Sequence, residues 1–375
     1  MSQLYDDLFA GQSCPLGADA QQFADQLRNF DDIRQVMSRW PLAQTFNHLG
    51  LPARYQPSSG TQVPNLAARY ELYEKMGFVS PVLMFCAPGP SMAAYVVAGL
   101  GNEQQQDAFF GQFQQALCWS CFAMTEPTQG SDASAMQTTA TAVDGGFLIR
   151  GQKMFIGNAT IADTGVLFAR AAPGPLGINA FVFTPQHPAI TLRPLALSGL
   201  DGVTLAQMQF HDLFIPSANV LGQHLKPTQR FAQSAISTFD ALRPCVGALA
   251  LGVARRAMHE WQACVTPTPA QSQQLSRLKR RWHAAYREAL AVCEAFDARQ
   301  APRKSPGMVK TTCVVLAEDI VNQLIHAFPA DRWPLPKALW QSFCDVKAFE
   351  YTEGTRQIHR LSQSFSPHPI RQECQ

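Results

Sequence analysis

The sequence predicts an α+β fold with a β domain between two helical domains, because the spacing of apolar residues changes twice along the chain. Residues 1–117 and 223–375 place apolar residues at the spacing of helices. Residues 118–222 alternate apolar and polar residues between Gly and Pro turns, as strands do. We therefore expect three domains with these bounds, and a ligand site between them.

The N-terminal domain is expected to be helical. Residues 87–101, APGPSMAAYVVAGLG, predict a helix that begins after a proline and ends at a glycine. Apolar residues at helical spacing, with polar residues between them, predict further helices over 19–40, 65–77 and 102–117.

The middle domain opens with a hairpin signal. Residues 138–157, TTATAVDGGFLIRGQKMFIG, alternate, turn at Asp-Gly-Gly and alternate again. Further short strands are expected over 166–171, 179–185, 190–195 and 205–216. Their Gly and Pro turns favour an antiparallel β domain.

The C-terminal domain returns to helical spacing. Residues 243–265 are apolar on most faces, which predicts a helix at the centre of a bundle. An amphipathic helix is expected over 274–300 and a second buried helix over 310–328. The breaks fall at TPTPAQS (266–272) and APRKSPG (301–307).

Composition limits the class of function. Hydrophobic residues make up 46% and charged residues 15% of the chain, which favours a globular protein whose surface is partly covered by another subunit. The net charge of +2 gives no reason to expect a nucleic-acid partner. There is no transmembrane run, and MSQLYDDLFAGQS lacks the basic start and apolar core of a secretory signal. We expect a cytoplasmic protein without membrane insertion.

The ten cysteines are scattered without the spacing of a disulfide framework, which predicts reduced thiols. Cys118 and Cys121 form a CxxC pair inside an apolar run. Their surroundings favour core cysteines over a redox or zinc role. No metal-binding cluster of His, Asp or Glu stands out, so no metal is expected.

Residues 122–132, FAMTEPTQGSD, form a polar stretch directly after an apolar run. Gly130 and the preceding Thr128-Gln129 pair force the chain to turn. Such a turn presents backbone N–H groups and the hydroxyls of Thr125 and Ser131, and it can lie flat against a planar cofactor. The alternative is a simple capped turn in which Ser131 or Asp132 holds the backbone.

This stretch resembles the signature of the acyl-CoA dehydrogenase flavoproteins, and five further motifs occur in that family's order. The resemblance runs from about residue 80 to 361 and implies an N-terminal helical domain, a middle antiparallel β domain and a C-terminal four-helix bundle. It is that of a divergent member, and the family includes short divergent relatives that serve biosynthetic acyl carrier proteins. The motifs are LGNEQQQ (100–106), GFLIRGQKMFIGNATIAD (146–163), FHDLFIPSANVLG (210–222), FDALRPCVGALALGVARRA (239–257) and EYTEGTRQIHR (350–360).

The resemblance implies FAD-dependent α,β-dehydrogenation of an acyl thioester, carried by coenzyme A or by an acyl carrier protein. Glu353 matches the family's base, which removes the α-proton while the β-hydride passes to flavin N5. Desolvation raises the basicity of such a carboxylate. The thioester oxygen is expected to accept hydrogen bonds from the Glu353 N–H and a ribityl hydroxyl. The alternative is a surface carboxylate before a helix, with Gly354 and Thr355 as turn and cap. The offset of Glu353 from Asp345 and Lys347, which fits the family's Asp-Ala-Arg, favours the base.

The family's ligand contacts can be carried over residue by residue. Arg243 read alone is a common helix-start arginine, and its register within FDALRP favours a ligand role. The implied FAD contacts are Phe122, Met124, Thr125, Gly130, Ser131, Phe155, Ile156, Gly157, Thr355 and Gln357. The implied substrate contacts are Ser131, Phe239, Asp240, Arg243 and Gly354.

Several positions depart from the family pattern. Phe155 replaces a tryptophan over the flavin, Gly157 replaces a threonine or serine near N5, and Asp201 stands where an arginine is common. In the family, two stretches bind the FAD diphosphate and adenine across a subunit interface. In this sequence they are replaced by CVTPTPAQSQQ (264–274) and QLIHAFPADRW (323–333). Phosphate binding needs glycine amides and fixed guanidinium groups, for which Arg332 or Lys279 would be partial substitutes.

The leading interpretation is an acyl-thioester dehydrogenase that passes electrons to an electron-transfer flavoprotein or another acceptor and forms a homo-oligomer, with a dimer favoured. One alternative is a non-catalytic or half-site partner subunit of another dehydrogenase, because the diphosphate motifs are missing. Another is a flavin oxidase or monooxygenase on the same fold, because Gly157 removes a hydrogen bond near N5.

Overall fold

The computed structural model describes residues 16, 19–29, 32–57, 65–130, 132, 135–226, 230 and 236–365. The chain forms two compact units, and neither is a continuous stretch of sequence. The sheet unit consists of Leu16–Asn65 and Ser80–Phe239. The helical unit combines Leu66–Val79 with the chain from Asp240 onward.

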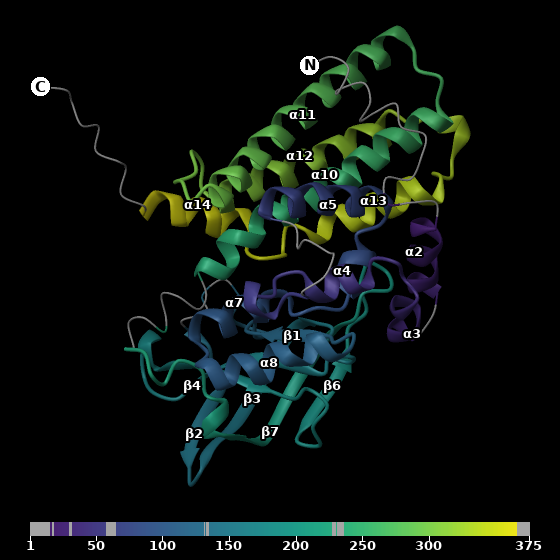
Figure 1. Ribbon diagram of the computed structural model, residues 1–375. Helices are drawn as coiled ribbons and strands as arrows, with labels where there is room; N and C mark the ends of the chain where they lie inside the picture. The colour runs from purple at the N-terminus through teal and green to yellow at the C-terminus, as the bar shows by residue number, and fades with distance from the viewer. Residues whose placement is uncertain are drawn as a thin grey trace, which may run out of the picture. The chain divides into compact units, whose positions relative to one another are not determined.

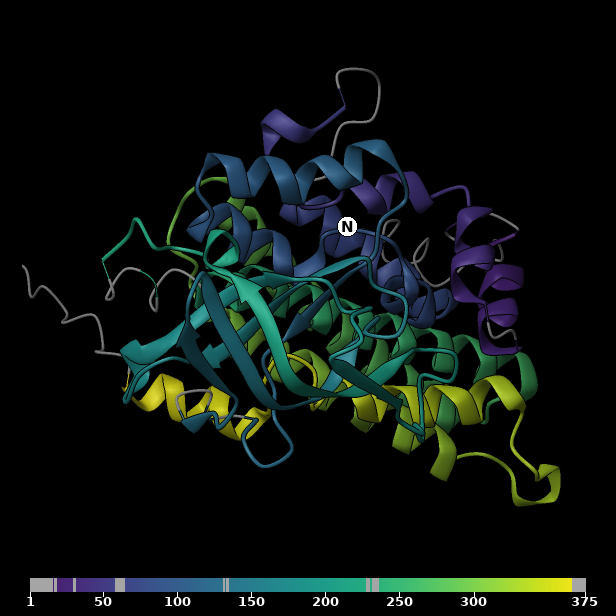
Figure 2. The same ribbon diagram turned by 90° about the horizontal axis from the view of Figure 1, so that it is seen from below.

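A seven-stranded sheet organises the sheet unit, in the order β1-β4-β2-β3-β7-β6 with β5 paired to β4. The predicted hairpin is confirmed, because β2 and β3 pair antiparallel across the Asp-Gly turn. Figures 1 and 2 show the sheet in two views. The sheet is not wholly antiparallel, since β1 pairs with β4 in parallel. The strands are β1 (Ser120–Ala123), β2 (Thr139–Val143), β3 (Gly146–Gly157), β4 (Thr164–Arg170), β5 (Ile178–Phe183), β6 (Ile190–Pro194) and β7 (Leu205–Pro216).

Short helices cover part of this sheet. The helix predicted after Pro90 is confirmed as α7, and it packs against β1 and β4. The single helix expected over 19–40 is two helices, α2 and α3, because the Asp32 carboxylate accepts a hydrogen bond from Gln35 N and starts a new helix there. The helices of this unit are α2 (Ala20–Asn29), α3 (Ile33–Ser38), α4 (Ala43–His48), α6 (Val82–Cys86), α7 (Ser91–Leu100) and α8 (Glu103–Gln115), with 3₁₀ turns at Ala53–Tyr55, Pro175–Gly177 and Ser217–Asn219.

The helical unit is the predicted C-terminal bundle with one added helix from earlier in the chain. Its long helices α10, α11 and α12 lie side by side (Figure 1). Thr268 and Ser305 cap the starts of α11 and α12, each followed by a proline, so the predicted breaks fall where expected. The helices are α5 (Leu66–Val79), α10 (Ile236–Cys264), α11 (Pro269–Asp297), α12 (Pro306–His326), α13 (Lys337–Ala348) and α14 (Arg356–Phe365), with a 3₁₀ turn at Ala330–Arg332.

The added helix, α5, packs very closely on α10. A Cβ atom on Gly77 would lie 2.2 Å from the Leu249 carbonyl oxygen, and one on Gly252 would lie 2.1 Å from that of Glu74. The buried Glu74 carboxylate pairs with Arg255 of α10 at 2.6 Å. Glycine is therefore required at both positions for the two backbones to approach.

The cysteines in the described part of the chain are free thiols. Cys118 and Cys121 are both buried, so the prediction of core cysteines is confirmed. Burial raises the pKa of the Cys118 thiol to about 12, which makes it a poor nucleophile at neutral pH. Within the described residues, no helix has the length and apolar character needed to cross a bilayer.

Candidate functional site

In the sheet unit, the predicted flavin-facing residues begin where β1 ends. Phe122 packs edge-on against Phe239, with ring centroids 6.1 Å apart, and against Phe168 at 5.3 Å. Met124 is buried and Thr125 is half-buried. The Thr125 carbonyl accepts a hydrogen bond of 2.8 Å from Met154 N, which attaches this loop to β3.

The next residue, Glu126, fixes the loop from inside. Its carboxylate accepts hydrogen bonds from Gln137 N at 2.6 Å and Thr138 N at 2.9 Å, and it forms an ion pair with Lys153 at 2.9 Å. The Lys153 ammonium also donates to the Met124 carbonyl at 2.9 Å. Both side chains are buried, so the pair positions the whole TEP turn. Sequence reasoning missed this pair; the available signal was a lysine at an inward-facing position of β3.

Burial alone would raise the pKa of Glu126, but Lys153 and the hydrogen bonds at residues 137 and 138 outweigh it. The pKa of this carboxyl therefore lies below its usual value. Burial lowers the pKa of Lys153 to about 8, against the opposing attraction of Glu126. Glu126 is a satisfied structural carboxylate and leaves no free basic oxygen for chemistry.

Phe155 lies on a bulge of β3. The register with β7 shifts between Lys153 and Ile156, which leaves Met154 and Phe155 unpaired. Phe155 has a φ of +59° and its side chain is 59% exposed. An exposed aromatic residue held in the left-handed region is unusual and indicates a functional constraint.

The residues around this bulge differ in exposure. Ile156 is buried, and Gly157 is half-buried opposite Leu205 of β7. A Cβ atom on Gly157 would have its nearest neighbour, Leu205 Cδ2, at 3.7 Å, so the site has room for a hydroxyl side chain. Gly130 is exposed, and the predicted contact Ser131 lies outside the described residues.

In the helical unit, the candidate base Glu353 lies on a tight turn before α14. Its φ is +56° and that of Gly354 is +99°, so both residues are in the left-handed region. The residue is half-buried, and its Oε2 atom is buried without a hydrogen-bond partner. Burial raises the pKa of this carboxyl to about 8, although Arg243 and Lys310 oppose the rise. A carboxylate of this kind is desolvated, basic and unoccupied by protein donors.

Arg243 and Asp240 are brought to this turn from α10. The Arg243 Nε donates to the Glu353 carbonyl at 3.3 Å, and its Nη1 pairs with Asp240 at 2.8 Å. Lys310 of α12, which the sequence did not single out, donates to the carbonyls of Glu350 and Gly354. Thr355 precedes α14, where Ile358 N approaches its hydroxyl at 3.5 Å, and Gln357 is exposed.

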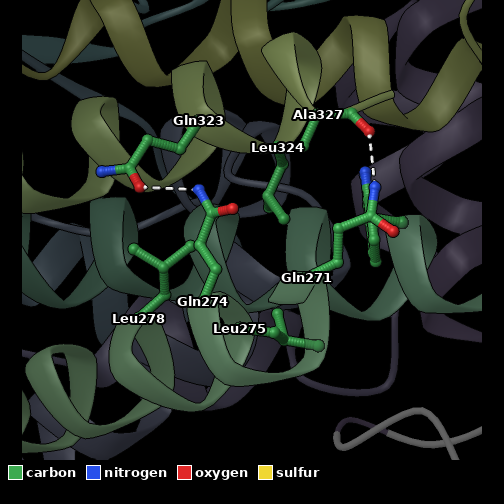
Figure 3. Close-up of a pocket in the computed structure, with 8 residues that line it drawn as sticks. Gln271, Gln274, Leu275, Leu278, Gln323, Leu324 and Ala327 are labelled. Carbon is green, nitrogen blue, oxygen red and sulfur yellow. Dashed lines mark hydrogen bonds between the residues drawn. The ribbon is translucent and has the colours of Figure 1, made fainter. Parts of the chain in front are cut away.

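The two segments that replace the family's diphosphate grip meet each other at a pocket between α11 and α12 (Figure 3). Gln271 Nε2 donates to the Ala327 carbonyl at 3.3 Å, and Gln274 Nε2 donates to Gln323 Oε1 at 3.1 Å. Arg332 donates to the Cys264 carbonyl at the end of α10. The two glutamine contacts join α11 to the C-terminal end of α12, and the Arg332 contact joins the 3₁₀ turn to α10.

The residues present fit a flavin ring better than they fit its diphosphate tail. In the sheet unit, the exposed ring of Phe155 is an aromatic plate of the kind that an isoalloxazine ring stacks on. In the helical unit, the unpartnered, basic oxygen of Glu353 suits an acidic C–H bond. The 264–274 and 323–333 segments bring together amides, carbonyls and apolar side chains.

Comparison with known proteins identifies the family. The model for the acyl-CoA dehydrogenase middle domain matches residues 121–213, and that for the acyl-CoA dehydrogenase C-terminal domain matches residues 232–363. A probable acyl-CoA dehydrogenase of Bacillus subtilis is 26% identical over 85% of this chain and 88% of its own length. The short-chain acyl-CoA dehydrogenase of Clostridium acetobutylicum is 23% identical over 84% of this chain and 86% of its own length.

Solved structures share the fold. Butyryl-CoA dehydrogenase from Megasphaera elsdenii has a TM-score of 0.76 at 21% identity and covers 96% of this chain and 95% of its own. Glutaryl-CoA dehydrogenase from Mycobacterium smegmatis, in complex with FADH2, has a TM-score of 0.74 at 17% identity over 94% of this chain and 97% of its own. The chain thus belongs to the acyl-CoA dehydrogenase family, the oxidoreductases that act on CH–CH donors, and FAD is its cofactor.

Proposed function

We propose that the protein removes the α and β hydrogens of an acyl thioester, with Glu353 as the base that takes the α-proton. The observation that carries this proposal is the buried Oε2 atom of Glu353, which lacks a protein partner and belongs to a carboxyl whose pKa is raised to about 8. A base works best when its pKa lies near the working pH. Glu353 meets that requirement.

The chain's own residues supply three functions in this reaction. Glu353 accepts the α-proton at a carboxylate oxygen, and its backbone N–H donates to the thioester oxygen as charge develops there. Phe155, Ile156, Gly157 and the loop at Phe122–Thr125 hold the flavin ring, with Thr355, Gln357, Gly130 and Ser131 as further contacts. FAD, when bound, supplies the acceptor for the β-hydride.

The acyl carrier is coenzyme A or an acyl carrier protein, contacted near Phe239, Asp240, Arg243, Gly354 and Ser131. Relatives described as acyl-CoA dehydrogenases favour coenzyme A. An electron-transfer flavoprotein is the proposed electron acceptor, since a structure described as the electron transferring flavoprotein of Acidaminococcus fermentans shares this fold with a TM-score of 0.80. We propose that the protein is a cytoplasmic homodimer. Light scattering that shows a stable monomer at micromolar concentration would contradict this proposal.

The test uses the purified full chain with added FAD under anaerobic conditions. Acyl-CoA thioesters of several chain lengths, and the same acyl groups on an acyl carrier protein, are mixed with the enzyme while flavin absorbance is followed. Loss of the oxidised-flavin band together with formation of the 2-enoyl thioester supports the proposal. Unchanged absorbance with every thioester, in protein shown to contain FAD, would exclude it.

The contacts between α11 and α12 favour a second candidate, a non-catalytic or half-site partner subunit that completes the FAD site of another dehydrogenase and holds FAD only weakly by itself. Each charge-assisted bond to a phosphate contributes roughly 1.5–3 kcal/mol, so losing two would weaken FAD binding by about a hundredfold or more. We expect the protein to purify with less than full flavin and to bind added FAD in isothermal titration. Binding seen only after a second dehydrogenase-like chain is added would establish the partner-subunit function.

A further inference from the structure

Lys310 is a fully buried lysine in the second turn of α12, with 0% of its surface exposed. Its ammonium donates to the Glu350 carbonyl at 3.1 Å and to the Gly354 carbonyl at 2.5 Å. These two carbonyls are the two ends of the turn that carries Glu353. One side chain from α12 therefore closes the turn, and the carbonyls in return satisfy a charge that is costly to bury.

Other contacts besides that of Lys310 also hold this turn. A Cβ atom on Gly354 would lie 2.9 Å from His359 Cε1, and one on Gly307 of α12 would lie 2.5 Å from His359 Nδ1. The His359 ring is thus wedged between α12 and the turn. Arg243 supports the turn from α10 through the Glu353 carbonyl. Left-handed residues such as Glu353 persist only when surrounding contacts enforce them.

We infer that Lys310 is a positioning residue for Glu353: its ammonium joins the two ends of the turn and holds the carboxylate where it can meet the α-proton. This inference rests on the proposed function of Glu353 as the base. Lys310 does not contact the reacting atoms, and its effect passes through the backbone of residues 350–354 and through its charge.

The charge of Lys310 also acts on the base directly. Glu353 interacts electrostatically with Arg243 and Cys245 from α10 and with Lys310 from α12. Asp240 pairs with Arg243, Glu350 attracts Lys310, and His359 from α14 is influenced by both cations. Burial raises the pKa of Glu353, and the cations Arg243 and Lys310 limit that rise. Burial lowers the pKa of His359 to about 4, so this ring is neutral near pH 7 and adds no competing charge.

The test compares Lys310→Met with Lys310→Arg in the full-length holoenzyme. The matched control is Lys304→Met, which removes an exposed lysine paired with Glu288. In Lys310→Met we expect kcat to fall by about a hundredfold, as for a misplaced catalytic group, with the acidic limb of the kcat/KM profile moved to higher pH. Lys310→Arg restores the position of that limb, and Lys304→Met changes neither quantity.

A second readout needs no substrate. Infrared difference titration follows the protonated-carboxyl band that is lost in Glu353→Gln, and the midpoint of that band rises in Lys310→Met. If Lys310→Met does not fold, Lys310→Gln, which keeps an amide donor group, takes its place in the comparison with Lys310→Arg. An unchanged midpoint and an unchanged pH profile overturn the inference about Lys310. Absence of thioester turnover in the wild-type holoenzyme would instead overturn the proposed function, while the infrared midpoint would still decide the role of Lys310.

Discussion

Glu126 in the sheet unit and Glu353 in the helical unit are both carboxylates withdrawn from water, yet their surroundings are opposite. Glu126 accepts from two backbone N–H groups and an ammonium, and its pKa lies below the usual value. Glu353 has an oxygen without a partner, and its pKa is raised to about 8. The difference separates a carboxylate that stabilises the fold from one kept ready for a proton.

The largest expected effect comes from removing the basic oxygen. Glu353→Gln keeps the shape of the side chain, so FAD binding and thermal stability should persist while turnover falls by about a hundredfold or more. The measurement is anaerobic flavin reduction by an acyl-CoA. The exposed Glu294 on α11 gives the matched control, Glu294→Gln, which should keep full activity. A Glu353→Gln variant that retains most of its turnover would place the base elsewhere.

The second effect should appear in stability. Glu126→Gln leaves Lys153 buried without its counter-charge, and breaking such a pair typically costs about 3–5 kcal/mol. Chemical denaturation of the two proteins measures this difference. Glu103→Gln removes the exposed partner of Arg54 and should cost under about 1 kcal/mol. Equal losses in the two variants would show that Glu126 has no special structural role.

The two carboxyls should also differ in the sign of their pH dependence. The folded-state pKa of Glu353 lies above its unfolded value, so its contribution to stability falls as pH rises from about 4.5 through about 8. The folded-state pKa of Glu126 lies below its unfolded value of about 4.5, so its contribution to stability is present above about pH 4.5 and is lost as the pH falls below that value. We expect the stability of Glu353→Gln relative to wild type to increase between about pH 4.5 and about pH 8 in denaturant titrations. A difference that stays constant with pH would mean that Glu353 titrates normally.

The smallest effect concerns Gly157, where a Cβ atom would make only an ordinary contact with Leu205. Gly157→Ser should change the free energy of unfolding by no more than about 0.5 kcal/mol. If the protein is an oxidase, the added hydroxyl near the flavin should slow oxidation of the reduced enzyme by oxygen several-fold in stopped-flow measurements. Gly111→Ser on α8, which also has open space, is the control. An oxygen rate that is slow in wild type and unaffected by Gly157→Ser would remove the oxidase alternative.

The spacing of apolar residues predicted most helices and strands, because each element buries one face and the residues of that face recur at regular intervals in the local sequence. The motif around Glu353 could be found for the same reason, since its residues are adjacent in the chain. The lysines that support the site could not be assigned: Lys153 reaches Glu126 across 27 positions and Lys310 reaches Gly354 across 44. Each occupies a buried position of its strand or helix, and a lysine at a buried position is the signal that indicates a hidden partner.

The close packing of Gly77 and Gly252 has a consequence for how this protein can be divided. Because α5 comes from the first quarter of the chain and Arg255 requires its Glu74, a gene fragment that starts at Asp240 would expose the groove of α10 and leave a buried guanidinium without its counter-ion. Neither unit can therefore be exchanged with a relative by a single recombination point. Any viable chimera has to carry Leu66–Val79 along with the C-terminal helices.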